Sequence, residues 1–201
     1  MRLFNMPSSG NSYKVRLLLA LSGLKVELIN VEYGWETLIQ AKAEGKLPFG
    51  KAPVLELEDG TLLPESNAIL CHLGRDTPFV PADALDHAQM LSWMFWEQNQ
   101  HESVIAVRAA LLTYPHRKAQ ATPEGLAELL ERGHAILKIM DDHLARRDWL
   151  VGDGPSLADI CLYAYTHTAE TLGGFDLAPF PALRNWLARV AALPGYVGLD
   201  D

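Results

Sequence analysis

The first 76 residues alternate strand-like and helical runs in an order that few folds accommodate. Four short apolar runs have the length and alternation of strands, and they lie at residues 2–6, 25–31, 53–57 and 61–63. Three helical runs separate or follow them, and they lie at residues 12–22, 35–45 and 65–73. Asp59-Gly60 between the last two strands is typical of a hairpin turn. The order βαβαββα predicts a parallel βαβ unit followed by a hairpin and a helix, which gives a mixed four-stranded sheet covered on both faces.

The remainder of the chain carries only helical patterns. Two prolines interrupt all periodicity around residues 76–84, so we expect a linker there. A stripe of large side chains from Met90 to His101 then predicts a long helix that continues towards Leu112. Further helices begin at cap-like or proline positions, which are Thr122-Pro123, Ser156 with Asp159, and Pro181. We therefore predict an α/β domain, a linker and an all-helical domain, at residues 1–76, 77–86 and 87–201.

Charge and cysteine content exclude several classes of protein. The net charge of -8 argues against a general nucleic-acid binder, because neutralising phosphates requires a basic surface. No apolar stretch is long enough for a signal peptide or a membrane span, so we expect no membrane association and a cytoplasmic location. Cys71 and Cys161 form no CxxC pair, and we expect two buried, reduced thiols. The histidines show no metal-ligand spacing, so we expect no metal.

Two predicted helix starts in the first domain have the chemistry of anion sites. Ser9 and Asn11 precede the first helix, and Glu65-Ser66 opens the third. The free N–H groups and partial positive charge of a helix N-terminus stabilise an anion and lower the pKa of a thiol placed there. A serine hydroxyl at such a start can donate a hydrogen bond to a thiolate without acting as a base. The same residue types are common helix caps, so this pattern alone leaves a purely structural role open.

Several motifs, in order and spacing, resemble those of soluble glutathione S-transferases. Ser9–Val15 resembles the loop-to-helix segment of bacterial-like members that use a serine near the glutathione sulfur. Lys51–Leu55 resembles the family's cis-proline strand, and Leu63–Ile69 resembles its Glu-Ser glutathione motif. Gly152 with Ser156–Ile160 resembles the capping box of the family's buried C-terminal helix. The likeness covers essentially the whole chain and implies a thioredoxin-like domain followed by a helical-bundle domain.

By this resemblance the protein binds the thiol tripeptide glutathione as a co-substrate and ionises it. The implied catalytic residues are Ser9, Asn11 and Ser12, with Ser9 in the register of the functional hydroxyl and Ser8 or Ser12 as alternatives. The implied glutathione-binding residues are Lys51, Ala52, Pro53, Val54, Glu65 and Ser66. The resemblance implies a cis bond before Pro53, backbone pairing of Val54 with the cysteinyl part, and Glu65-Ser66 at the γ-glutamyl end. Lys51 could pair with the glycine carboxylate or hold the backbone.

The resemblance also implies an acceptor site lined by the first helix of the helical domain. The predicted lining residues are Trp93, Trp96, Gln100, His101 and Arg108. Aromatic side chains there suit a small hydrophobic electrophile, although core packing is the favoured role for Trp93 and Met94. The Ser156-x-x-Asp159 box is expected to be structural, and loss of its cap should cost about 1–2 kcal/mol. Members of the family pair as two-fold homodimers, so we expect a homodimer.

Four functions follow from these motifs, and transfer of the glutathione thiolate to an electrophilic carbon is favoured. The Ser9-x-Asn11 pattern resembles a bacterial subgroup that acts on disulfides, so a glutathione-dependent disulfide or peroxide reductase stays open. The loop has no cysteine, which disfavours a mechanism with an enzyme thiol. A maleyl-type isomerase ranks lower, because its family carries Ser-Ser-Cys where this chain has Ser8-Ser9-Gly10. A non-catalytic interaction module with the same fold is the fourth, and the retained glutathione motifs argue against it.

Overall fold

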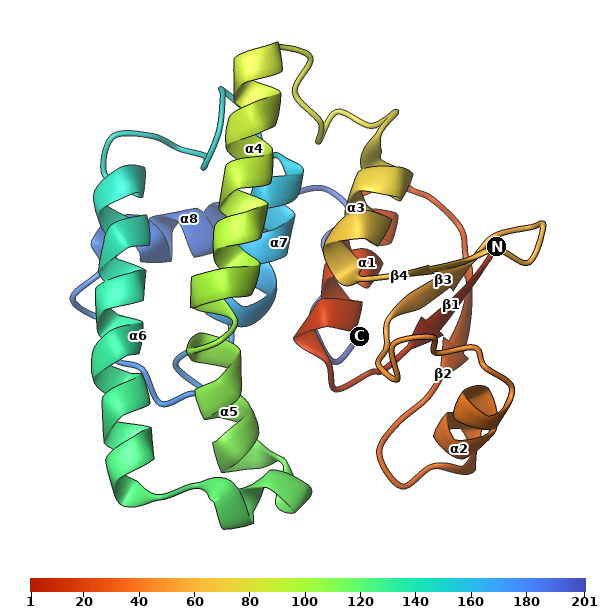
Figure 1. The fold of residues 1–201 in the computed structure, drawn as a ribbon. Helices are drawn as coiled ribbons and strands as arrows, with labels where there is room; N and C mark the ends of the chain where they lie inside the picture. The colour runs from red at the N-terminus through yellow and green to blue at the C-terminus, as the bar shows by residue number, and fades with distance from the viewer. The chain divides into compact units, whose positions relative to one another are not determined.

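The alternating runs of the first part of the chain fold into the predicted mixed sheet with three helices. The computed structural model describes residues 1–201 throughout (Figure 1). The elements are β1 (Arg2–Asn5), α1 (Gly10–Ser22), β2 (Glu27–Asn30), α2 (Glu36–Ala43), β3 (Val54–Glu56), β4 (Leu62–Pro64) and α3 (Ser66–Gly74). The strand order is β2-β1-β3-β4, with β1 parallel to β2 and β3 antiparallel to both β1 and β4. The predicted thioredoxin-like architecture is confirmed.

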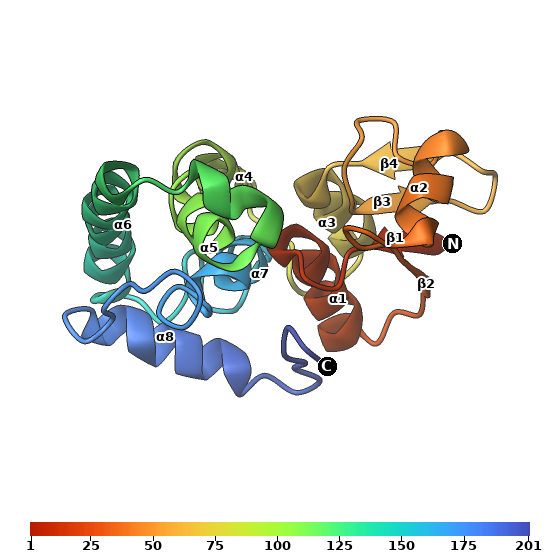
Figure 2. The same cartoon turned by 90° about the horizontal axis from the view of Figure 1, so that it is seen from below.

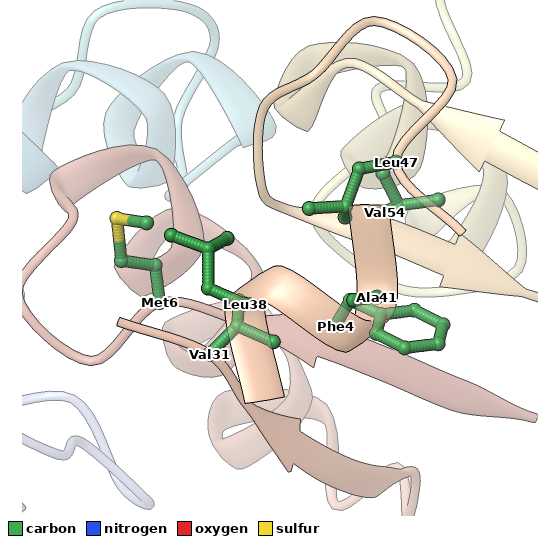
Figure 3. Packing of buried hydrophobic residues seen from close by; sticks show 7 residues of the cluster. All are labelled: Phe4, Met6, Val31, Leu38, Ala41, Leu47 and Val54. Carbon is green, nitrogen blue, oxygen red and sulfur yellow. The ribbon is translucent and has the colours of Figure 1, made fainter. Parts of the chain in front are cut away.

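Strand alternation divides the side chains of this sheet between two cores. Leu3 lies opposite Leu55 and Phe4 lies opposite Val54 across β1 and β3, and successive residues of a strand point to opposite faces. On one face, Leu3 and Leu55 pack with residues of α1 and α3, which are Val15, Leu19 and Ile69. On the other face the core includes residues of α2, and it comprises Phe4, Met6, Val31, Leu38, Ala41, Leu47 and Val54 (Figure 3). A slip of one residue would exchange the two cores, so burial fixes the register.

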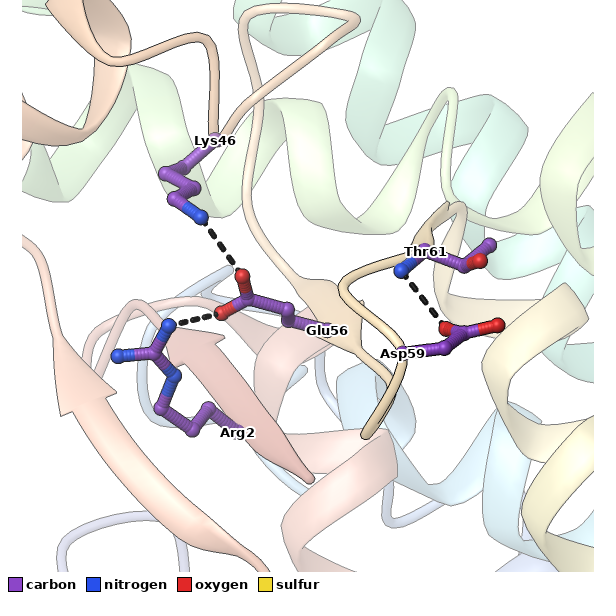
Figure 4. Close-up of polar contacts among 5 residues, drawn as sticks. All are labelled: Arg2, Lys46, Glu56, Asp59 and Thr61. Atoms are coloured by element: carbon purple, nitrogen blue, oxygen red, sulfur yellow. Dashed lines mark hydrogen bonds and ion pairs between the residues drawn. The ribbon is translucent and has the colours of Figure 1, made fainter.

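A buried carboxylate joins two segments at the far end of β3. Glu56 is 5% exposed, and it pairs with Arg2 of β1 and with Lys46 after α2, each at 2.6 Å (Figure 4). The hydrogen bond from Lys46 lowers the pKa of the Glu56 carboxyl, burial opposes this, and the Arg2 charge adds to the lowering. The adjoining hairpin closes where the Thr61 N–H donates to Asp59 Oδ1 at 2.9 Å, and Gly60 takes a left-handed φ of 86°.

The second unit is entirely helical, as predicted. Its elements are α4 (Ala84–Trp96), the π-helix η1 (Glu97–His101), α5 (Ile105–Thr113), the 3-10 helix η2 (Pro115–Gln120), α6 (Pro123–Leu144), α7 (Leu157–Thr166) and α8 (Pro181–Ala191). The helix starts predicted at Pro123 and Pro181 are observed. None of the helices in either unit has the length and apolar character needed to cross a membrane.

The prediction of one continuous helix from Met90 towards Leu112 is wrong. The Glu102 N–H donates to the Glu97 carbonyl at 2.8 Å, which is the wider i→i+5 spacing of a π-helix. Just beyond, the Ser103 hydroxyl donates to the Asn99 carbonyl at 3.0 Å. Such side chains compete with backbone N–H groups for helix carbonyls, so the α-helical ladder is interrupted between α4 and α5.

The start of α7 is the centre of a buried polar cluster. Asp159 is 1% exposed, and its Oδ2 accepts from both the N–H and the hydroxyl of Ser156 at 2.8 Å. Its Oδ1 accepts from the Leu150 N–H at 3.0 Å and from Nε1 of Trp186 in α8 at 2.9 Å. Burial raises the pKa of Asp159, and these four donors act in the opposite direction. The predicted capping box is confirmed, and the tertiary structure extends it to a second helix.

The two units are not divided at a single point in the chain. Residues 1–80 and 193–201 form the first unit, and residues 81–192 form the second. The sequence pattern assigned 193–201 to the helical domain, whereas these residues make their contacts within the first unit. The boundaries at residues 76 and 87 stay a prediction. Cys161 is buried and Cys71 is half-buried, and both are free thiols.

Replacing Glu56 with Gln should lower the free energy of unfolding at neutral pH by about 1 kcal/mol, because it removes two charge-assisted contacts with partly exposed partners. The pKa of Glu56 is depressed in the folded state. Its contribution is therefore complete above the unfolded-state pKa and is lost as the pH falls through the folded-state pKa.

Urea unfolding at about pH 7 and about pH 3.5 measures this dependence, since the interval spans the ordinary glutamate pKa. Glu58→Gln, in the exposed hairpin turn, is the matched control. An equal loss for Glu56→Gln at both pH values would contradict the assignment.

Candidate functional site

Ser9 lies at the N-cap of α1, and it is the residue that the family resemblance predicts to carry the functional hydroxyl. Its N–H donates to the Met6 carbonyl at 3.0 Å, and its Oγ accepts a long hydrogen bond of 3.4 Å from the Ser12 N–H. The side chain is half-buried. A long, weak cap bond leaves the hydroxyl proton available to another acceptor. Ser9 therefore has the exposure and the donor that a contact with a ligand requires.

Ser12, by contrast, has a structural position. It is fully buried, and its Oγ accepts a hydrogen bond from the Met6 N–H at 3.0 Å. This bond ties the end of the β1 segment to the first turn of α1. The predicted role of Ser12 as a catalytic residue has no exposed hydroxyl to support it, which leaves Ser9 and Asn11 as the predicted sulfur contacts.

Glu65 and Ser66 lie at the start of α3, and a hydrogen bond joins this start to that of α1. The Ser66 hydroxyl donates to Asn11 Oδ1 at 3.0 Å, across 55 residues of sequence. Ser66 is 4% exposed, whereas the Glu65 side chain is exposed. Glu65 is also the one non-glycine residue with a positive φ, at 73°. Such a conformation costs about 1–3 kcal/mol and is concentrated at ligand-binding positions.

The register of the sheet explains why these motifs converge. Phe4 at the end of β1 lies opposite Val54 at the start of β3, and Val54 lies opposite Pro64 at the end of β4. β3 runs antiparallel to both neighbours, so its first residue lies beside the last residues of β1 and β4. The segment that leads to α1, the segment that follows Pro53 and the segment that leads to α3 therefore lie at the same edge of the sheet. The loop that carries Ser9 and Asn11 is thereby brought together with Pro53-Val54 and Glu65-Ser66, which follow it by about 40 residues or more along the chain (Figure 1).

The proline strand has the geometry that the resemblance implies. The Ala52–Pro53 peptide bond is cis, and Pro53 and Val54 are both buried. Lys51, immediately before them, is exposed, so its ammonium group is open to a ligand carboxylate. The prediction of a cis bond at this position is confirmed.

The electrostatics of this edge favour an anion. The N-termini of α1 and α3 each present unsatisfied N–H groups and a partial positive charge. Neither helix carries an acidic residue in its first turn, so no side chain neutralises that charge from within the helix. The whole chain is acidic, with a net charge of -8. The two helix starts carry positive partial charge locally, against this negative overall charge.

Two residues that hold the loop around Ser9 had no signal in the sequence. Glu32 Oε2 accepts from the Ser8 N–H at 3.1 Å, and its Oε1 accepts from the Tyr33 N–H at 2.9 Å. Arg16 Nη2 donates to the Pro7 carbonyl at 3.3 Å. Both side chains act on backbone groups of a loop that only the fold brings near them, so no local motif marks them.

The predicted acceptor-site residues divide by exposure. His101 is fully buried and its Nε2 lies 3.0 Å from Thr166 Oγ1, so it offers no surface to a ligand in this structure. The Arg108 guanidinium donates at 2.7 Å to the carbonyls of Gly173 and Leu126, which is a packing role. Trp93, Trp96 and Arg108 are half-buried, and Gln100 is exposed. Trp93, Trp96 and Gln100 make no such packing hydrogen bonds and stay the predicted acceptor residues of the helical unit.

The helical unit also contains an open cavity of about 820 Å³, which none of the predicted site residues lines. It lies between the end of α6 and α8, and its polar lining includes Arg146, Arg147 and Arg189. Arg189 is already paired with Asp148 at 3.2 Å. No group of three or more histidine, cysteine, aspartate or glutamate side chains is arranged to hold a metal ion.

Comparison with known sequence families accounts for most of the chain. Residues 3–79 match the family described as the glutathione S-transferase N-terminal domain, and residues 104–194 match the glutathione S-transferase C-terminal domain. A solved glutathione S-transferase from Xanthobacter autotrophicus Py2 is 42% identical, covers 98% of this chain and 96% of its own, and superposes with a TM-score of 0.89.

Two further relatives differ in what they are named for. The disulfide-bond oxidoreductase YfcG of Escherichia coli (strain K12) is 27% identical over 92% of this chain and 87% of its own length. A glutathione transferase homolog from Sulfitobacter, solved with bound glutathione, is 23% identical, with a TM-score of 0.77 over 96% of this chain and 93% of its own. That last likeness is one of fold.

A double-mutant cycle between Asn11 and Ser66 should give a coupling free energy of about 1 kcal/mol, because the two side chains share one partly buried hydrogen bond. The variants are Asn11→Ala, Ser66→Ala and the pair, and the measurement is urea unfolding without ligand. Asn11→Ala with Ser103→Ala is the control, since Ser103 is exposed in the turn between η1 and α5 of the other unit. Additive losses for Asn11 and Ser66 would contradict the contact between the two helix starts.

Proposed function

The chain belongs to the glutathione S-transferase family, and from this premise we propose that it binds glutathione, stabilises the thiolate and directs it at a small hydrophobic electrophile. The observation that carries the proposal is the hydrogen bond of 3.0 Å between Ser66 and Asn11. It fixes two anion-binding helix starts at one edge of the sheet, as recognition of the two ends of one short peptide requires.

Different residues at this edge would bind the three parts of the tripeptide. The Ser66 N–H would donate to the γ-glutamyl carboxylate, and the Ser66 hydroxyl would turn its one proton from Asn11 Oδ1 to the same carboxylate when the ligand binds. The exposed Glu65 carboxylate would pair with the γ-glutamyl ammonium group. The main chain of Val54 would pair with the cysteinyl residue as an added strand does, and Lys51 would pair with the glycine carboxylate. The sulfur would then lie by the start of α1, within reach of Ser9.

In this arrangement the enzyme contributes chiefly to ionisation and orientation. A free cysteine thiol has a pKa of roughly 8.5, and a helix N-terminus with a hydroxyl donor lowers it. Each unit of lowering corresponds to about 1.4 kcal/mol of preference for the thiolate. The thiolate attacks the electrophilic carbon, a carbon–sulfur bond forms, and the leaving group departs with the electron pair or the addition product takes up a proton. Trp93, Trp96 and Gln100 are the proposed acceptor contacts.

A second candidate, a glutathione-dependent disulfide reductase, is favoured by one observation. Asn11 accepts the hydrogen bond that connects the starts of α1 and α3. The relative YfcG is named as a disulfide-bond oxidoreductase. In such a reaction the glutathione thiolate attacks a disulfide, the departing thiolate takes up a proton, and a second glutathione releases the other thiol from the mixed disulfide as oxidised glutathione forms. The loop from Ser8 to Ser12 contains no cysteine, and burial raises the pKa of the half-buried Cys71. For either function, the protein is proposed to be a homodimer and to be located in the cytoplasm.

Ser9→Ala should raise the pKa of bound glutathione by about one unit, because it removes the proposed hydrogen bond to the thiolate. The ultraviolet absorbance of the thiolate, followed as a function of pH with saturating glutathione, measures this pKa. Ser103→Ala is the control for handling and folding. An unchanged pKa in Ser9→Ala, with a raised one in Asn11→Ala, would transfer the role to Asn11.

Glu65→Gln and Ser66→Ala should each weaken glutathione binding by about tenfold, which is the loss expected for one charge-assisted hydrogen bond. The rate of the chemical step at saturation should change by about twofold or less. Calorimetric titration with glutathione gives the binding constant, and saturation kinetics with an electrophilic aryl halide give the rate. Intact binding in both variants would contradict the γ-glutamyl assignment.

A further inference from the structure

Arg16 joins two backbone segments that are far apart in sequence. Its Nη2 donates to the Leu199 carbonyl at 2.7 Å and to the Pro7 carbonyl at 3.3 Å. One guanidinium nitrogen carries two N–H groups, so it can serve both carbonyls at once. Proline has no N–H, and its carbonyl is therefore the only backbone group by which the loop can be held at that residue. Pro7 lies two residues before Ser9.

The 193–201 segment is fitted to one face of α1 by two further features. The Tyr13 hydroxyl donates to the Val197 carbonyl at 2.8 Å. Gly195 has a φ of 85°, and a Cβ there would lie 2.9 Å from the Ala20 carbonyl oxygen, so only glycine permits this approach. Tyr13, Arg16 and Ala20 lie three and four residues apart, on a single face of the helix. Figure 2 shows the C-terminus beside α1.

The environment of Arg16 restricts the guanidinium to this position. Arg16 is half-buried, its carbon Cζ lies 5.7 Å from the centre of the Tyr13 ring, and burial lowers its pKa. Nη2 of Arg16 donates to the two carbonyls, whereas the buried Nε has no hydrogen-bond partner. The nearby Tyr13 and the Asp200 carboxylate oppose the effect of burial on the Arg16 pKa, so the 193–201 segment also acts on Arg16 through charge.

We propose that Arg16 is a positioning residue that couples the 193–201 segment to the loop carrying Ser9, so that the docked segment fixes the hydroxyl for the glutathione sulfur. This rests on the proposed function of Ser9. The loop has other ties on its opposite side, where Glu32 holds the Ser8 N–H and Ser12 holds the Met6 N–H. Arg16 is the tie that depends on a distant segment, since Leu199 lies 183 residues beyond Arg16 in the chain.

The coupling should be visible in the ionisation of bound glutathione. Arg16→Met should raise the thiol pKa by about 0.5 unit, so that thiolate at neutral pH falls about threefold, because the Ser9 donor is less well placed. Binding of S-methylglutathione, which has no thiol proton, should change by less than about twofold. Tyr13→Phe removes a tie of the segment without touching Pro7, and it should raise the pKa in the same direction by a smaller amount.

Three outcomes would overturn the coupling. Arg16→Lys retains the positive charge but lacks the planar guanidinium with its several N–H donors. If the thiol pKa in Arg16→Lys equals that in the unmutated protein, the effect of Arg16 is one of charge. An unchanged pKa in Tyr13→Phe would show that the segment takes no part. An equal pKa shift in Arg75→Met, where the arginine is exposed and paired with Asp76, would mark the effect as non-specific. If Arg16→Met does not fold, the lysine and phenylalanine variants carry the test.

Amide hydrogen exchange without glutathione separates this inference from the proposed function. Arg16→Met should speed the exchange of the Ser9 and Ser12 amides by about tenfold, because both hydrogen bonds belong to the loop that is released. Arg75→Met should leave them unchanged. Faster exchange in a protein that does not bind glutathione would refute the proposed function alone. Unchanged exchange in a protein that does bind it would refute the coupling alone.

Discussion

The hydrogen bond from Ser66 to Asn11 is the contact on which the site depends. It joins the first turns of two helices that leave different strands, and it does so at the edge of the sheet where both strands end. Apolar packing of Val15 and Leu19 of α1 with Ile69 of α3 sets the separation of the two helices. The hydrogen bond adds a direct tie between their first turns, where each helix has its positive partial charge.

That contact exists because of the sheet register. β3 runs antiparallel to β1 and β4, so its beginning lies between the ends of its neighbours. The register is in turn held by burial, since Leu3 and Leu55 face one core while Phe4 and Val54 face the other. The ion pairs of Glu56 fasten the opposite end of the same strand. Apolar packing in the sheet thus sets the geometry of the edge that carries the candidate site. The polar contacts at that edge contribute less free energy than the apolar burial that positions them.

Local signals were accurate where a few neighbouring residues decide the outcome. Thr122 caps α6, Ser156 and Asp159 form the expected box, and the hairpin turns at Asp59-Gly60. The cis bond before Pro53 followed from a family resemblance, since the sequence physics alone favours trans. Local signals were insufficient where the decisive partner is distant. The predicted continuous helix breaks at His101, and no local signal showed that Ser12 is buried against the end of β1.

The sequence by itself determined the order of strands and helices, the caps, the acidic charge and the family of motifs, because each depends on short-range periodicity or on residue type. Only the tertiary structure decided that Ser66 reaches Asn11, that Glu32 and Arg16 hold the loop around Ser9, and that residues 193–201 return to α1. The first contact joins two side chains that lie 55 residues apart, and the others join side chains to distant backbone groups. Backbone carbonyl and N–H groups are present at almost every residue, so nothing in the sequence marks which one a side chain will bind.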